Sequence, residues 1–336
     1  MKNKTAVLLV NLGTPDSPSV SDVRSYLSQF LNDPRVIDIP WLMRKILVNL
    51  IIVPFRAPKS AKVYKKLWTE KGSPLLFHSN NVKGLLQEAL GEGFDVFLAM
   101  RYKNPSIPNV LDEIRKKNYP RIIVLPMFPQ YSSAATGSAL DEVMRVIRSW
   151  WVIPEVRMIS QYYAHPMFID AFVDRGRKYN ISEYDHVLFS YHGLPERQVD
   201  KVYESGLCAD HNCEHELTEE NKFCYKATCY ATTRLLAEKL SIPQEKYTVC
   251  FQSRLDKKWL TPFSDAVVRE CAQKGMKRLL VFSPAFTADC LETIIEIGEE
   301  YQEIFHEHGG EKVQLVESLN DHPLWVACLK DIVLSN

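Results

Sequence analysis

Four acidic residues late in the chain have a spacing that suits metal or proton transfer. They are Asp289, Glu292, Glu296 and Glu300. The three glutamates are four residues apart, so on a helix they form one nearly axial row. Asp289 lies near the predicted start of that helix, where a carboxylate is favoured. Like charges at this spacing repel each other, and a solvated helix face is the ordinary alternative explanation for such a row.

A histidine follows the short apolar segment 186–189, which predicts a buried strand. His192 leads into Gly193 and Pro195, and a proline cannot continue a strand ladder. In open α/β sheets, ligands bind just past the carboxyl ends of the strands. The alternative is a loop histidine that only bonds the backbone. An imidazole facing Glu292 at the same sheet edge could pass a divalent metal such as Fe(II), or accept protons.

A second possible metal site lies in a cysteine-rich segment. Four of the eight cysteines fall within 22 residues, at Cys208, Cys213, Cys224 and Cys229. Clustered thiolates bind zinc or an iron–sulfur centre. The spacing differs from the short Cys-x2-Cys of zinc ribbons and does not decide between these metals. Four free thiols are the alternative.

Polar and aromatic residues after other predicted strands could bind a substrate. Arg101 and Tyr102 follow one strand, and Tyr131 and Ser132 open a hydroxyl-rich loop after the next. An arginine and hydroxyl groups at one sheet edge suit carboxylates. Two further residues, Trp259 and Phe286, offer aromatic faces, with core packing as the alternative for each.

The elements that position these residues form a repeated pattern. Apolar strand segments recur in the same order in the two halves of the chain, and each later strand is joined to the next by a helical pattern. Alternating strands and helices indicate parallel sheets with right-handed crossovers. The sequence therefore predicts two similar Rossmann-like α/β domains. The paired strand segments are 7–10 and 187–190, 96–100 and 247–251, and 121–126 and 278–282.

The repeat also predicts the domain boundaries. An N-terminal domain is expected over 1–150, a C-terminal domain over 151–310, and a closing segment over 311–336. The cysteine-rich insertion falls at about 205–230. Extra length at about 31–68 carries apolar groups beside basic residues, which suits a lip over a large apolar ligand or contact with an anionic bilayer. The alternative there is a helix buried in the core.

The composition excludes several classes of function. Lys+Arg and Asp+Glu are both 41 in the 336 residues, so no overall basic field attracts nucleic acid. The uncharged, strongly apolar stretch 46–55 is half the roughly 20 residues that a membrane span needs. Without a secretory signal pattern, the cysteines indicate a reducing, cytoplasmic location rather than a disulfide frame. Neither G-x-G-x-x-G after the first strand nor a P-loop is present, which disfavours nucleotide enzymes.

Several motifs together resemble the ferrochelatase family over nearly the whole chain, from residue 7 to about 330. The segment 189–197, Phe-Ser-Tyr-His-Gly-Leu-Pro-Glu-Arg, is similar to the family's histidine signature. The segment 286–293, Phe-Thr-Ala-Asp-Cys-Leu-Glu-Thr, resembles its acidic motif. Further matches are Phe-Gln-Ser-Arg-Leu at 251–255 with Trp-Leu at 259–260, Asn-Leu-Gly-Thr-Pro at 11–15, Gly-Ser-Pro at 72–74, Arg-Tyr at 101–102 and Pro-Gln-Tyr-Ser at 129–132.

The resemblance implies insertion of Fe(II) into a porphyrin: protoporphyrin IX gives protohaem with release of two protons. It implies a porphyrin cleft between the two domains and peripheral contact with the inner membrane surface. His192 and Glu292 would be the metal-handling pair, with Asp289, Glu296 and Glu300 along the acidic path. Some family members carry a [2Fe-2S] cluster. The resemblance therefore implies that the four clustered cysteines bind [2Fe-2S], with zinc as the alternative.

The chain departs from the family pattern in a few places. The cysteine insertion replaces the usual Gly-Asp-Pro-Tyr, and Asp256 and Ile295 replace a glycine and a tyrosine that are common in the family. A coproporphyrin III ferrochelatase and a cobalt chelatase of the same fold are the rival enzymes. A haem or metal carrier without turnover is the rival of a different class.

Overall fold

The computed structural model describes residues 4–336, and the chain divides into two compact units. Unit 1 comprises the chain up to Phe128 together with Ser133–Gln161 and Val326–Asn336. Unit 2 comprises Pro129–Ser132 and Tyr162–Trp325. Each unit has its own sheet and its own apolar core.

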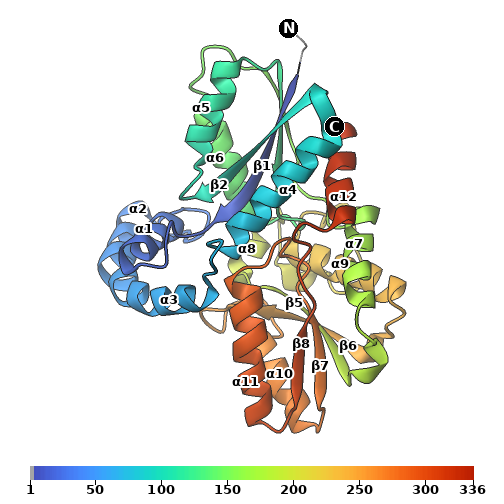
Figure 1. Ribbon diagram of the computed structural model, residues 1–336. Coiled ribbons are helices and arrows are strands. Elements are labelled where there is room, and N and C mark those ends of the chain that lie inside the picture. Colours follow the sequence, from blue (N-terminus) through green and yellow to red (C-terminus); the bar gives the residue numbers. More distant parts are fainter. Residues whose placement is uncertain (1–3) are drawn as a thin grey trace. The chain divides into compact units, whose positions relative to one another are not determined.

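The two sheets have the same strand order, and every strand pair in them is parallel. In unit 1 the order is β2 (Phe94–Tyr102), β1 (Thr5–Gly13), β3 (Arg121–Pro126) and β4 (Glu155–Met158). In unit 2 it is β6 (Tyr247–Gln252), β5 (His186–His192), β7 (Arg278–Phe282) and β8 (Lys312–Leu315). The prediction of an α/β fold with two similar parallel sheets is confirmed (Figure 1).

Helices α5 (Ile107–Lys117) and α6 (Ser138–Ile147) share one apolar core with the sheet of unit 1. In α5 the buried residues Ile107, Val110, Leu111 and Ile114 have helical spacing and form one face. The Ser106 side chain caps the first turn by accepting a hydrogen bond from the backbone amide of Asn109 at 3.4 Å. Helix α4 (Pro74–Leu90) packs beside β1 and β2.

In unit 2, α10 (Ser264–Gln273), the π-helix η7 (Glu292–Tyr301) and α11 (Gln302–Glu307) contribute to one core with the sheet. Leu279 and Val281 of β7 belong to that core, so the alternating side chain of Phe282 points to the other face. There Gly176, in α7 (Pro166–Arg177), lies so close that a Cβ would be 2.7 Å from the Phe282 ring. Helix α9 (Tyr225–Lys239) packs against α7.

Unit 1 extends further along the chain than the predicted boundary at 150 and 151. The reason is β4, which continues the sheet of unit 1 by pairing with β3. Residues 326–336 also belong to unit 1, and the side chains of Arg121 and Arg157 bond Asn336 there. The predicted closing segment 311–336 is therefore divided, because β8 pairs with β7 in unit 2.

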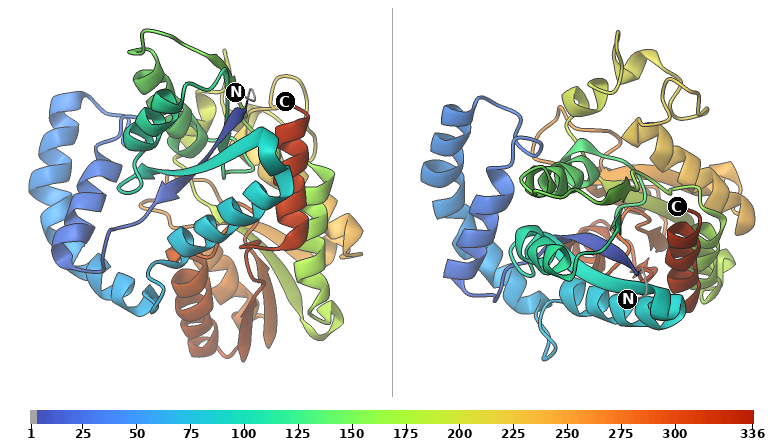
Figure 2. Two further views of the ribbon diagram at one scale, coloured as in Figure 1. Left: turned by 45° about the horizontal axis from the view of Figure 1, so that its top comes forward. Right: turned by 90° about the horizontal axis from the view of Figure 1, so that it is seen from above.

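The extra length predicted at 31–68 forms a group of helices in unit 1. It contains α2 (Trp41–Ile46), the π-helix η1 (Leu47–Ile52) and α3 (Val53–Leu67), and it packs beside α1 (Val20–Leu31). These helices form the blue group at the side of unit 1 in both views of Figure 2. The remaining elements are α8 (Glu196–Asp200), α12 (Pro323–Leu334), η2 (Gly91–Gly93), η3 (Ser133–Gly137), η4 (Ile181–Glu183), η5 (Cys208–Asp210) and η6 (Gln244–Lys246).

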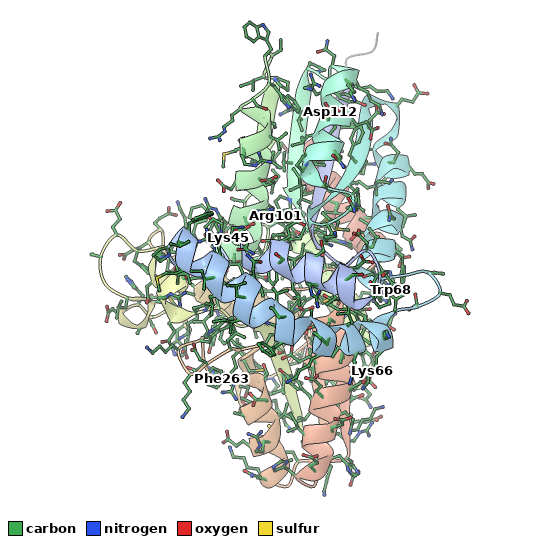
Figure 3. The ribbon with its side chains drawn as sticks, turned by 90° about the vertical axis from the view of Figure 1, so that its left-hand side faces the viewer. Lys45, Lys66, Trp68, Arg101, Asp112 and Phe263 are labelled. Carbon is green, nitrogen blue, oxygen red and sulfur yellow. The ribbon has the colours of Figure 1, made fainter. Side chains whose placement is uncertain are left out.

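Seven large apolar side chains of this group are exposed. We call them the apolar lip: Trp41, Leu42, Met43, Ile46, Leu50, Ile51 and Phe55. The alternative for this segment, a helix buried in the core, is therefore wrong. Lys45 and Lys66 lie on the same group (Figure 3), but Arg44 is buried and donates to the carbonyls of Ile37 and Ile39. Across residues 4–336, no helix combines the length and apolar character needed to cross a bilayer.

Gly13 ends β1 where the strand approaches β2. It has φ +112°, and a Cβ there would lie 2.0 Å from the Tyr102 carbonyl oxygen. We therefore expect Gly13→Ala to lower the free energy of unfolding by roughly 2–4 kcal/mol, measured by urea denaturation. The matched control is Gly84→Ala on an open face of α4, which should stabilise by about 0.5–1 kcal/mol. Equal effects at the two positions would contradict this reading of β1.

Candidate active site

His192 is the last residue of β5, so it lies where the sequence predicted, at the carboxyl end of a parallel strand. Its Nδ1 is 2.6 Å from the Gly193 carbonyl oxygen. A carbonyl oxygen only accepts, so Nδ1 carries the hydrogen and donates it. In the neutral ring this leaves Nε2 with a free lone pair. The backbone bond that was the alternative role for this histidine thus orients the imidazole and selects its tautomer.

The loop after His192 is fixed to the segment that carries Trp259. The Gly193 amide donates to the Gln252 carbonyl at 2.7 Å, and a Cβ on Gly193 would lie 2.8 Å from that oxygen. Pro195 forms a bridge with Trp259. The rings of Trp259 and Phe286 have centroids 6.5 and 6.3 Å from that of His192. Two aromatic residues therefore flank the imidazole.

Gln252 connects the His192 strand to the acidic helix. The β5–β6 register places it opposite His192. Its Nε2 donates to the Glu292 carbonyl at 2.9 Å and to the Glu296 carboxylate at 3.1 Å. Its Oε1 accepts from the Ser190 hydroxyl at 2.7 Å. This buried amide brings Glu292 and Glu296 to the same sheet edge as His192.

The three glutamates lie on a π-helix, η7, where the sequence predicted a regular helix. A π-helix has i→i+5 hydrogen bonds, is rare, and is frequently found at functional sites. Its buried residues are Thr293, Ile295, Ile297 and Tyr301, while Glu292 and Glu296 are half-buried. Residue spacing alone does not distinguish this geometry, because i and i+4 lie on similar faces in either helix.

The Glu296 carboxylate is held by a group of donors. It accepts from the Ser253 amide at 2.8 Å, from the Ser253 hydroxyl at 2.5 Å and from the Tyr301 hydroxyl at 3.1 Å. Burial, and then the Glu296 charge, raise the pKa of Tyr301, so its hydroxyl keeps its proton and donates. Ser253 has φ +61°. A residue other than glycine in this conformation is strained, and the bonds to Glu296 hold it there.

Asp289 and Glu300 have other surroundings. The Asp289 carboxylate accepts from the Asn320 side chain at 2.7 Å, the Ser318 amide at 3.2 Å and the Thr293 hydroxyl at 3.2 Å. Asp289 therefore fastens the start of the π-helix to the 318–320 loop. Glu300 is exposed at the far end of that helix.

Arg101 and Tyr102 surround a buried carboxylate, Asp33. Arg101 Nη2 and the Tyr102 hydroxyl donate to Asp33 Oδ2 at 2.5 and 2.9 Å, and Ser138 Oγ donates to the same oxygen at 2.5 Å. Burial, and then the Asp33 charge, raise the pKa of Tyr102. These residues thus have an internal carboxylate partner, which the sequence analysis missed because no local pattern marks Asp33.

Tyr131 and Ser132 belong to unit 2, although the sequence placed them in the N-terminal half. The Tyr131 ring packs edge-on against Phe223, with centroids 5.9 Å apart. The neighbouring Gln130 side chain donates to Thr232 at 3.0 Å. Ser132 is buried.

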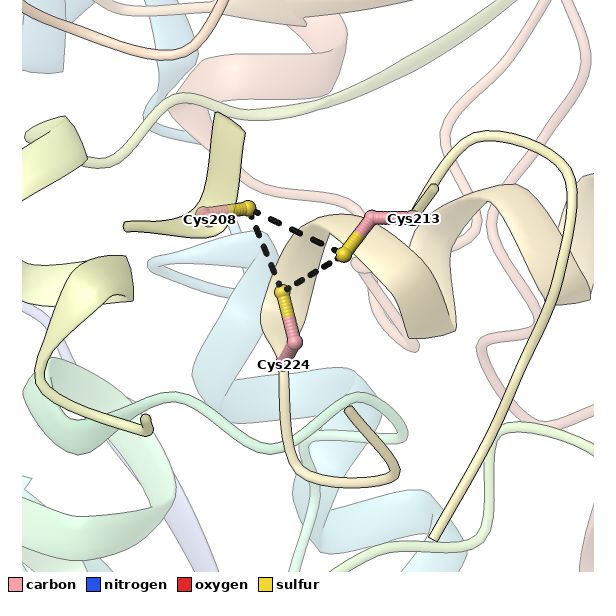
Figure 4. Close-up of side chains that lie close together, drawn as sticks. All are labelled: Cys208, Cys213 and Cys224. Atoms are coloured by element: carbon pink, nitrogen blue, oxygen red, sulfur yellow. Dashed lines mark hydrogen bonds between the residues drawn. The ribbon is translucent and has the colours of Figure 1, made fainter. Parts of the chain in front are cut away.

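Three of the four clustered cysteines come together in unit 2. The Sγ atoms of Cys208, Cys213 and Cys224 are 3.6–3.9 Å apart, and all three residues are buried (Figure 4). Contacts from Cys208 and Cys224 lower the pKa of the Cys213 thiol. Cys229 lies five residues along, on α9, and is fully buried outside this group. The fourth predicted ligand is therefore not with the other three.

Comparisons with known proteins agree with these features. A sequence profile of the family described as Ferrochelatase matches residues 4–336. The protein named Ferrochelatase from Legionella pneumophila (strain Lens) is 44% identical over 331 residues, 98% of each chain. Ferrochelatase from Coxiella burnetii (strain Dugway 5J108-111) is 45% identical over 328 residues, 96% of this chain and 91% of that protein. The solved structure of SirB from Bacillus subtilis with Fe3+ has a TM-score of 0.57 at 12% identity and covers 99% of this chain and 95% of its own, which shows the same fold.

Ser253 offers a test of the strained turn that Glu296 holds. Ser253→Ala and Ser253→Gly both remove the hydroxyl bond, but only glycine relieves the positive φ. We expect Ser253→Gly to be more stable than Ser253→Ala by about 1 kcal/mol in urea denaturation. At the exposed helical position Glu238, alanine should instead be the more stable replacement by about 1 kcal/mol. The same order at both positions would disprove strain at Ser253.

Proposed function

Since this chain belongs to the ferrochelatase family, we propose that it inserts Fe(II) into protoporphyrin IX, with release of two protons, to give protohaem. The observation that carries the proposal is His192, whose Nε2 lone pair is left free by the bond from Nδ1 to Gly193. Gln252 holds the carboxylate-bearing helix at the same strand end.

Metallation requires that two pyrrole N–H protons leave as the metal enters. A neutral imidazole with one free lone pair can accept such a proton or contact the metal. We assign this step to His192 and delivery or coordination of Fe(II) to Glu292, whose hard carboxylate oxygen suits a divalent ion without binding it as firmly as thiolates would. Glu296 and then Glu300 lead from Glu292 along the π-helix, as a path for ions or protons.

The aromatic residues beside His192 support a flat substrate. The rings of Trp259 and Phe286 flank the imidazole and offer apolar faces to a tetrapyrrole. Binding energy from the macrocycle and its propionates can then be used to bend the ring and expose the nitrogen lone pairs. We assign substrate contacts also to Tyr131 and Ser132. Arg101 and Tyr102 hold the loop that carries Asp33 in unit 1. The N–H groups of Arg101 that do not bond Asp33 or Ser138 are suited to a propionate.

The cysteine group supports a second, resident metal site. Three buried thiols within 3.9 Å of one another form a set of soft donors on the insertion that follows α8. We propose that this site binds either zinc or an iron–sulfur centre, the two groups that such thiolates hold.

The apolar lip supports contact with the inner membrane surface from the cytoplasmic side. Its side chains are exposed, with Phe55 at 74% and Leu50 at 69%, and α3 adds the exposed cations Arg56, Lys59 and Lys62. Apolar groups beside lysines and arginines suit an anionic bilayer surface.

The central proposal is tested by anaerobic mixing of the protein with protoporphyrin and Fe(II), followed by the Soret shift. We expect His192→Ala to slow turnover by about 100-fold to 10,000-fold while porphyrin binding, followed by fluorescence quenching, changes little. The control is His306→Ala, an exposed histidine on α11 that should leave turnover unchanged.

One outcome tests the role of His192, and two others separate the proposed activity from its rivals. Retention of most activity by His192→Ala would disprove the role of that residue. Faster turnover with coproporphyrin III, or with Co(II) and a more carboxylated tetrapyrrole, would favour the rival enzymes. Tight binding of haem without consumption of porphyrin would favour a carrier.

Membrane contact is tested by sedimentation with phosphatidylglycerol vesicles. We expect the double substitution Leu50→Ser and Phe55→Ser to weaken binding at least about tenfold, because each side chain would lose more than 1 kcal/mol of apolar burial. Leu334→Ser, at an exposed apolar position on α12, should have no effect. Equal binding by all three proteins would disprove a role for the lip in membrane contact.

A further inference from the structure

The geometry of the three-cysteine site distinguishes between the two kinds of metal group. The Sγ atoms of Cys208 and Cys224 are 3.6 Å apart, those of Cys213 and Cys224 3.8 Å, and those of Cys208 and Cys213 3.9 Å. The sulfurs thus form a nearly equilateral triangle. Four ligands placed tetrahedrally at about 2.3 Å from one ion, the usual zinc–sulfur distance, are separated by about 3.8 Å. The observed triangle matches one face of such a tetrahedron.

A [2Fe-2S] cluster requires a different arrangement. Each of its irons is bound by two bridging sulfides and two terminal thiolates, so the four cysteines form two pairs at opposite ends of the cluster. A third thiolate would therefore have to lie well away from the first pair. In this chain the third sulfur is as close to the other two as they are to each other. The three thiols do not fit the family's binuclear cluster.

The fourth cysteine does not complete such a cluster either. Cys224 is the N-cap of α9, and Cys229 lies five residues further along that helix. Five residues turn a helix by about 140° beyond a full turn, so Cys229 points away from the Cys224 sulfur. Across residues 4–336, the set of Cys, His, Asp and Glu ligand atoms within 4.8 Å of one another contains Cys208, Cys213 and Cys224 alone.

From this geometry we infer that the cysteine site binds one tetrahedral divalent ion of the zinc class through Cys208, Cys213 and Cys224, with Cys229 as a core residue. The inference rests on the metal site proposed above and decides its nature. Three protein ligands leave one position of the tetrahedron to a small donor such as water.

The surroundings of Cys213 support a thiolate at that position. The Tyr203 hydroxyl lies 3.0 Å from Cys213 Sγ, and the Asn221 side-chain amide donates to the same sulfur at 3.6 Å. Tyr203 is buried, and its ring stacks on His211 with centroids 4.0 Å apart. The ring is thus fixed so that its O–H can donate to a ligating thiolate. Hydrogen bonds of this kind orient metal ligands and tune their affinity. Tyr203 is a positioning residue in this site.

The metal would also fasten a long segment of unit 2. The Cys208 amide donates to Asp200 at 2.8 Å, at the end of α8, while Cys224 begins α9. One ion joining Cys208, Cys213 and Cys224 therefore closes the chain between the loop after His192 and helix α9. This places the site as a structural clamp beside the segment that carries the imidazole.

The test measures metal and acid-labile sulfide in the full chain as purified, and then the Co(II)-substituted protein. We expect one zinc-class ion per chain and no sulfide. Co(II) should give intense tetrahedral d–d bands and a thiolate-to-metal charge-transfer band. Cys208→Ser, Cys213→Ser and Cys224→Ser should each remove that band. Cys229→Ser and Cys229→Ala should keep it, as should the control Cys271→Ser, another buried cysteine. Thermal melting followed by circular dichroism verifies that each variant is folded.

Tyr203→Phe tests whether the Tyr203 hydroxyl acts on the metal site, because removal of a hydroxyl with a purely structural role would leave the metal affinity unchanged. We expect the Co(II) bands to remain while the affinity for Zn²⁺, measured by competition with a chelator, falls by about 10-fold to 100-fold. Two irons and two sulfides per chain, lost on substitution of Cys229, would overturn the inference, as would wild-type protein without a Co(II)–thiolate band. Porphyrin metallation is assayed on the same preparations. Loss of the Co(II) band in a wild-type protein that still metallates porphyrin would therefore count against this site and not against the proposed activity.

Discussion

The side-chain amide of Gln252 is the contact on which the candidate active site depends. It accepts from Ser190 on β5 and donates to the Glu292 carbonyl and the Glu296 carboxylate on the π-helix. Gln252 is almost fully buried, so an unpaired amide there would cost about 1–3 kcal/mol, and every one of its bonds is therefore strongly favoured. This requirement fixes the acidic helix against the strand end that carries His192.

A second set of bonds holds the same helix through Glu296 and Asp289. Glu296 holds Ser253 in a left-handed conformation and accepts from Tyr301, while Asp289 ties the helix start to the loop at 318–320. These bonds hold the π-helix at its start and at its middle, and none of them uses the Glu292 carboxylate.

Much of the fold follows from the sequence because the strands are short apolar runs. The central strands β1, β3, β5 and β7 were predicted since burial on both faces demands continuous apolar residues. The edge strands β4 and β8 were missed. Each has only four residues, of which at most one is buried, and this gives little signal. The boundary between the units shifted for the same reason, because β4 carries the chain of unit 1 past residue 150.

The site was predicted unevenly. His192 lies at the strand end and Glu292 on the helix where the sequence predicted them, because the apolar strand and the spacing of the glutamates mark these positions. The π-helix, the strained Ser253 turn and the buried Asp33 depend on contacts between distant segments, which no local pattern encodes. Cys229 was predicted as a ligand from the density of cysteines and from the family resemblance, but its place on the helix after Cys224 leaves it outside the group that the other three form.

The most direct test of the central claim is to count protons while the metal enters the ring. Protoporphyrin and Fe(II) are mixed anaerobically with the protein in weak buffer, and a pH indicator and the Soret band are followed together. The account predicts two protons released for each porphyrin metallated, with both signals rising at the same catalysed rate. Binding of porphyrin with a spectral change but without proton release, or no acceleration over the reaction without protein, would contradict it.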